Sequence, residues 1–145
     1  MKIMTIGFTK TTAENFFTRL VRGSVKRVID VRLNNKSQLA GFAKSTDLRY
    51  FLKAIGAIDY LYEPLLAPTQ DILDAYKKNK GDWDVYEKQF LSLMEQRGVE
   101  KRLAPKLFED SCLLCSEDKP HNCHRRLVAE YLQKKWDTPI EIRHL

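Results

Sequence analysis

Short apolar runs of strand length alternate along the chain with longer stretches in which apolar residues recur every three or four positions. The first pattern is typical of buried strands and the second of amphipathic helices. The runs predict five strands, at Lys2–Phe8, Lys26–Leu33, Ala57–Tyr62, Asp110–Ser116 and Ile140–His144. The periodic stretches predict helices from Thr11 or Thr12 to about Arg22, from Ser45 or Thr46 to Ile55, from Thr69 to about Lys78, from Asp82 or Trp83 to Arg97, and from Cys123 to Trp136.

Strands that alternate with helices predict an α/β fold with a mainly parallel sheet. Right-handed crossovers place the helices on both faces, which gives three layers. We expect a strand order of about 3-2-1-4-5. A length of 145 residues fits one domain that spans residues 1–145.

Ligands of such sheets bind beyond the carboxyl ends of the strands, near the point where the strand order reverses. The loops that follow strands one, two and four should therefore converge. They carry Gly7 and Thr9 after the first strand, Asp30 and Arg32 after the second, and Cys115 and Glu117 after the fourth. We expect a polar site at this edge.

The segment 115–126 holds two cysteines, two histidines, two acids and two arginines. On the helix that follows it, His124 falls at the centre of the apolar stripe, Arg125 at its edge and Arg126 on the solvent side. Arg125 and Arg126 also oppose the dipole of the helix at its first turn. Two explanations stay open. One is an anion held by Arg32 and Arg125, and the other is an internal ion pair between Asp30 and Arg125.

The candidate catalytic residues are Glu117, Cys123, His124 and Asp30, and the candidate substrate-binding residues are Arg32, Arg125, Gly7, Thr9 and Cys115. Glu117 is a candidate general acid or base. A thiol at a helix N-terminus beside a histidine can be nucleophilic, although cysteines that only pack are commoner. Cys112 and Cys115 are three apart in a strand and should face opposite sides. Cys115, His121, Cys123 and His124 match no common zinc spacing, so no metal or cofactor is predicted, with zinc or iron as an alternative.

The charge pattern indicates a class of binding partner. The net charge is +6, with basic patches at Lys77–Lys80 and Arg125–Arg126, which favours a nucleotide or nucleic-acid partner. No stretch is long enough to span a membrane, and the N-terminus does not read as a signal peptide. We therefore expect a cytoplasmic protein with three reduced cysteines and no membrane partner, and a homodimer is compatible with the sequence.

Three motifs carry a resemblance to a known family: Thr5-Ile6-Gly7, Asp30-Val31-Arg32, and Cys115-x-Glu117-x-x-Pro120-x-x-Cys123-His124-Arg125. In this order they resemble the bacterial and archaeal family named domain of unknown function 488. The family usually has a histidine where this chain has Phe8. The resemblance implies the fold and the site but no reaction. We expect a small enzyme acting on a nucleotide, nucleic acid or other anionic substrate. The alternatives are a nucleic-acid-binding module without catalysis and a metal-binding protein.

Overall fold

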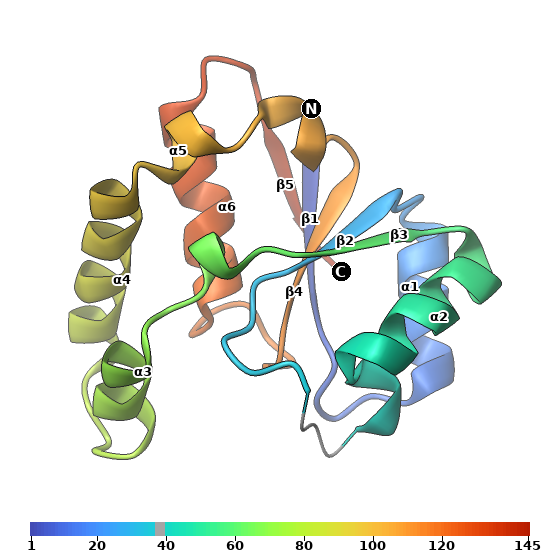
Figure 1. Ribbon diagram of the computed structural model, residues 1–145, viewed down its shortest axis with the longest axis horizontal. Coiled ribbons are helices and arrows are strands. Elements are labelled where there is room, and N and C mark those ends of the chain that lie inside the picture. Colours follow the sequence, from blue (N-terminus) through green and yellow to red (C-terminus); the bar gives the residue numbers. More distant parts are fainter. Residues whose placement is uncertain (37–39) are drawn as a thin grey trace.

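A computed structural model describes residues 1–36 and 40–145. The fold is α/β. A five-stranded, all-parallel sheet has the order β3-β2-β4-β1-β5 (Figure 1). Its strands are β1 (Lys2–Gly7), β2 (Arg27–Asp30), β3 (Asp59–Tyr62), β4 (Ser111–Cys115) and β5 (Glu141–His144).

The observed strand order corrects one detail of the expected one. β4 lies between β2 and β1, so Asp30 is in register with Leu114 and Gly7 with Cys115. β4 is the strand that is buried along its whole length, which suits the centre of the sheet. A helical crossover can lead to the neighbouring strand position in the sheet or to the position beyond it. The apolar pattern of a strand does not indicate which of the two occurs.

The helices begin close to the expected residues. α1 (Ala13–Arg22) is capped by the Thr12 hydroxyl, α3 (Gln70–Lys77) by Thr69 and α4 (Trp83–Arg97) by the Asp82 carboxylate. The remaining α-helices are α2 (Ser45–Gly56), α5 (Val99–Arg102) and α6 (His124–Lys135). Short 3₁₀ turns cover Gly41–Ala43, Pro64–Leu66 and Pro105–Phe108.

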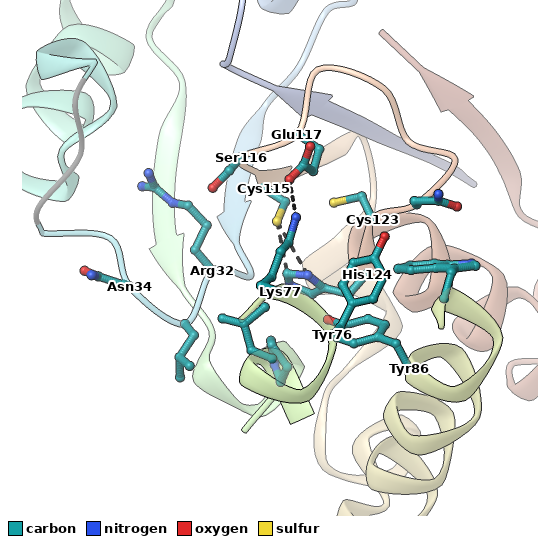
Figure 2. Close-up of a pocket in the computed structure, with 15 residues that line it drawn as sticks. Arg32, Asn34, Tyr76, Lys77, Tyr86, Cys115, Ser116, Glu117, Cys123 and His124 are labelled. Carbon is teal, nitrogen blue, oxygen red and sulfur yellow. Dashed lines mark hydrogen bonds and ion pairs between the residues drawn. The ribbon is translucent and has the colours of Figure 1, made fainter. Parts of the chain in front are cut away.

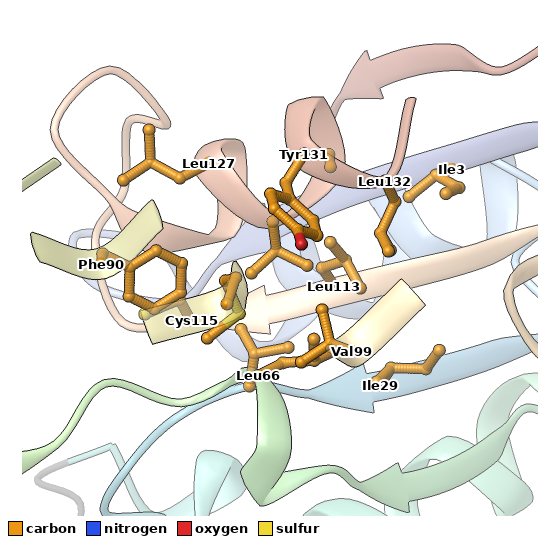
Figure 3. Close-up of a cluster of buried hydrophobic side chains, with 14 of the residues drawn as sticks. Ile3, Ile29, Leu66, Phe90, Val99, Leu113, Cys115, Leu127, Tyr131 and Leu132 are labelled. Atoms are coloured by element: carbon orange, nitrogen blue, oxygen red, sulfur yellow. The ribbon is translucent and has the colours of Figure 1, made fainter. Parts of the chain in front are cut away.

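The sheet has a hydrophobic core on each face, as the three-layer prediction requires. α1 and α2 cover one face, and α4 and α6 cover the other (Figure 1). On the α4–α6 side, Leu113 and Cys115 pack with Phe90 and Leu127 (Figure 3). Cys112 lies in the opposite core, so the two strand cysteines face opposite sides as expected.

No helix within the described residues combines the length and the apolar character needed to cross a bilayer.

Candidate functional site

A cavity of about 230 Å³ opens beyond the carboxyl ends of β2 and β4. The loops after these strands form one side, α3 and α4 form the other, and the first residues of α6 form the floor (Figure 2). Five of the expected site residues line it: Arg32, Cys115, Glu117, Cys123 and His124. The other lining residues are Leu33, Asn34, Pro68, Leu73, Tyr76, Lys77, Trp83, Tyr86, Ser116 and Asn122.

Cys115, Cys123 and His124 form a buried cluster at the floor of this cavity. Their ligand-type atoms all lie within 4.8 Å of one another. The Cys115 Sγ is 3.5 Å from the His124 Nδ1. The His124 Nε2 lies 2.7 Å from the Val31 carbonyl oxygen. Because a carbonyl only accepts, the His124 Nε2 donates its proton to Val31, which leaves Nδ1 on the side of the sulfurs.

The surroundings of the two thiols push their pKa values apart. A hydrogen bond with Cys115 lowers the pKa of Cys123 well below its usual value, and His124 and the charge of Arg125 add to this effect against the cost of burial. The same hydrogen bond, together with burial, raises the pKa of Cys115. Cys123 is also the N-cap residue of α6, where the helix dipole favours an anion. The two thiols are therefore not equivalent, and Cys123 loses its proton more readily than Cys115.

Asp30 forms an ion pair with Arg32, not with Arg125 as the internal-pair hypothesis supposed. The Arg32 Nε and Nη2 atoms each donate to the Asp30 carboxylate at 2.8 Å. The hydroxyl of Tyr60 donates to the same carboxylate at 2.6 Å, and the Asn35 amide adds a weaker bond at 3.3 Å. Asp30 is fully buried and does not line the cavity, which favours a structural role for it.

Arg125 is fully buried and binds backbone carbonyls instead of an acid. Its Nη1 donates to the Glu117 carbonyl, its Nη2 to the Asp118 carbonyl at 3.4 Å, and its Nε to the Thr5 hydroxyl at 3.3 Å. The sequence could not show that Arg125 binds these carbonyls, because only the folded loop brings them to the guanidinium. Arg125 holds the loop after β4 against the sheet, and within the described residues it pairs with no carboxylate.

Gly7 and Thr9 also hold this loop, outside the cavity. The Thr9 hydroxyl and amide both donate to the Ser116 carbonyl, at 2.9 and 3.1 Å. A Cβ on Gly7 would lie 1.5 Å from the Glu117 carbonyl oxygen. Glycine is therefore required here by the close approach of the two loops. Of the expected substrate-binding residues, Gly7, Thr9 and Arg125 hold the loop after β4 in place, whereas Arg32 and Cys115 line the cavity.

Sequence reasoning missed the wall opposite the cysteines. Trp83 and Tyr86 of α4 stack with ring centroids 5.0 Å apart, and Tyr76 of α3 packs against both rings. The Lys77 ammonium lies 2.7 Å from the Glu117 carboxylate (Figure 2). The apolar period of this segment predicted a helix from Asp82 or Trp83 to Arg97, which agrees with α4. Nothing in the sequence showed that the start of this face borders a cavity.

The family comparison covers most of this architecture. The model of the family described as domain of unknown function DUF488 matches residues 12–132. The chain belongs to the DUF488 family. No curated protein and no solved structure matches it.

The DUF488 match includes Asp30, Arg32 and the whole cavity-floor motif from Cys115 to Arg125, while β1 with its Gly7 precedes the matched residues. Phe8, where the sequence resemblance leads us to expect histidine, precedes the matched residues; it is buried, and its ring centroid lies 5.3 Å from the guanidinium carbon of Arg32. In this member of the DUF488 family, that position therefore contributes a packing surface for Arg32.

Proposed function

We propose that the protein is a zinc-dependent hydrolytic enzyme. Cys115, Cys123 and His124 hold the metal, and the reaction takes place in the cavity above them. The observation that carries the proposal is the 3.5 Å separation of the Cys115 Sγ and the His124 Nδ1, combined with the hydrogen bond from the His124 Nε2 to the Val31 carbonyl.

The distance between sulfur and nitrogen fits two ligands of one tetrahedral ion. With Zn–S near 2.3 Å and Zn–N near 2.05 Å, a tetrahedral angle places the two ligand atoms about 3.6 Å apart. Cys123 completes a set of three within 4.8 Å. Two thiolates and one imidazole are ligands that suit zinc, and catalytic zinc sites use this set with a fourth position left for water or substrate.

The Val31 carbonyl supplies the outer contact that such a site needs. Histidines that bind zinc almost always donate their second ring N–H to a carbonyl, a carboxylate or water, which fixes the ring and its tautomer. The bond from the His124 Nε2 has this arrangement at 2.7 Å. It leaves Nδ1 for the metal and orients the ring before any metal arrives.

The charges around the cluster favour an additional anion at the site. Zinc with two thiolates is neutral, and the Asp30–Arg32 and Lys77–Glu117 pairs each cancel. Arg125 would then be the uncompensated buried charge among these groups, and an anion bound at the site would balance it. Zinc lowers the pKa of bound water to about 7. In this scheme Glu117, which lines the same cavity, is the candidate proton acceptor.

A free thiol nucleophile is the second candidate, and the lowered pKa of Cys123 favours it. In that reaction the Cys123 thiolate would attack the substrate directly, with His124 beside it. The zinc proposal departs from the expectation of no metal, which rested on chain spacing alone. The two candidates differ in metal content, because a nucleophilic thiolate must be free of metal.

Nucleic-acid binding has weaker support from the same residues. Lys77, part of the expected basic patch, is paired with Glu117, and the Trp83 ring stacks on Tyr86 at the cavity wall. Because both side chains already have partners within the protein, neither is freely available to contact a nucleic-acid backbone.

Cobalt substitution tests the zinc proposal. Metal-free protein titrated with Co²⁺ should develop the visible bands of a tetrahedral ion and a near-ultraviolet thiolate-to-cobalt band. His124→Ala should lose these bands and bind the ion at least about 100-fold more weakly, since even changes outside the ligand set cost 10–100-fold. His121→Ala is the matched control, because His121 is exposed and lies outside the cluster.

The control variant should bind Co²⁺ as the unmodified protein does. Cys123→Ser, which nearly keeps the side-chain volume, repeats the test if His124→Ala does not fold. Equal spectra for the His121 and His124 variants would contradict the ligand assignment.

A further inference from the structure

The wall of the cavity opposite the cysteines is aromatic. Trp83 and Tyr86 stack at an interplanar angle of 22°, and the stack continues to Phe90, whose ring packs against the His124 imidazole at 5.3 Å. Burial, followed by the neighbouring thiols, raises the pKa of Tyr86, so its hydroxyl stays neutral. Stacked rings at the border of a small cavity suit a flat, apolar ligand surface.

Two cations also line the cavity. The Lys77 ammonium is half exposed and bonded to Glu117, and this interaction, together with the charge of Glu117, raises the pKa of Lys77 against the cost of burial. Arg32 is 2% exposed, and its Nη1 has no hydrogen-bond partner within the described residues. The Arg32 guanidinium is held by Asp30 and closed to solvent, so the Lys77 ammonium is the cation that a ligand in the cavity would meet.

The exposed Lys77–Glu117 pair is easily exchanged. Ion pairs between exposed side chains contribute little to stability, because water screens the charges and the long side chains lose freedom. A carboxylate or phosphate at Lys77 would therefore meet little resistance when it replaces Glu117. The pair keeps the cation ordered at the mouth of the cavity until such a group arrives.

We propose that the cavity binds a small ligand that combines one planar aromatic ring system with one carboxylate or phosphate group. The ring lies along Trp83 and Tyr86, and the anionic group replaces the Glu117 carboxylate at Lys77. This inference rests on the proposed function for the position of the reacting atoms. The cavity of about 230 Å³ lies below the range of roughly 300–1,000 Å³ usual for drug-sized ligands, so the ligand is small.

Tryptophan fluorescence tests the inference with two matched pairs of probes, nicotinate against nicotinamide and adenosine monophosphate against adenosine. The zinc-loaded protein carries Trp136→Phe, because Trp136 lies away from the cavity against Phe108 and would add a second signal. At least one anionic probe should quench Trp83 and bind about 10-fold more tightly than its neutral partner. Lys77→Met should remove this preference, whereas Lys78→Met, at the neighbouring exposed lysine, should keep it.

Failure of all four probes to quench Trp83 would overturn the inference. An anionic preference that persists in Lys77→Met would overturn the role of Lys77. Bound zinc is measured in the same samples, because the metal ligands and Lys77 are different residues. Protein that holds zinc but ignores every probe contradicts only the ligand class, and protein that holds no zinc contradicts the proposed function.

Discussion

Replacing Asp30 with alanine should lower the free energy of unfolding by about 3–5 kcal/mol, because it leaves the buried guanidinium of Arg32 without its anion. Arg32 is 2% exposed and directs two of its donors and its backbone amide to the Asp30 carboxylate. Tyr60 would lose its acceptor as well. Urea unfolding followed by circular dichroism measures the loss directly.

Asp59→Ala provides the matched control. Asp59 also lies in a strand and also forms an ion pair, with Lys53 at 3.0 Å, but the pair is exposed to solvent. Removing it should barely move the unfolding midpoint. Equal losses for the two alanine variants would contradict the structural role assigned to the Asp30–Arg32 pair.

Gly7→Ala should be the second severe change, with a loss of stability of about 3 kcal/mol, at the upper end for a side chain added to a packed interior. The new Cβ would lie 1.5 Å from the Glu117 carbonyl and 2.9 Å from the Arg125 Nη1. The obstacle is backbone, so the loop after β4 must move. Because this loop links Cys115 to Cys123, the affinity for Co²⁺ should fall together with the stability.

Gly41→Ala separates this steric effect from any general effect of replacing glycine. A Cβ at Gly41 meets no atom of residues 1–36 and 40–145 within 4 Å, and its backbone is compatible with alanine. That variant should match the unmodified protein in stability or slightly exceed it. A Gly7→Ala protein as stable as the Gly41 variant would show that the two loops do not approach as closely as described.

The sequence was sufficient for the fold class because local patterns determine it. Apolar runs and helix caps such as Thr12, Thr69 and Asp82 depend on neighbours in the chain, and they placed the elements within a few residues. The position of β4 between β2 and β1 depends on which strands meet across the sheet. That choice is made by packing between distant segments, and no local pattern records it.

For the candidate site too, local features could be predicted from the sequence and contacts between distant segments could not. The helical period correctly predicted that His124 faces the sheet and that Arg126 faces solvent. Arg126 pairs there with Glu130 and Glu87. The predicted partner of Asp30 was wrong. Arg32, two residues away, binds the Asp30 carboxylate in place of Arg125, and a carbonyl of the loop after β4 binds Arg125. The role of Trp83 and Lys77 was missed, since it depends on where α3 and α4 pack.

The metal content of the protein tests the central claim most directly. The untagged chain, purified under reducing conditions without chelator, should contain about one equivalent of zinc by elemental analysis, and the Cys115→Ser, Cys123→Ser double variant should contain none. Its three buried cysteines are free, so no disulfide competes for the ligands. Folded, reduced protein that lacks zinc and does not take it up on addition would contradict the metal site and leave Cys123 free of metal.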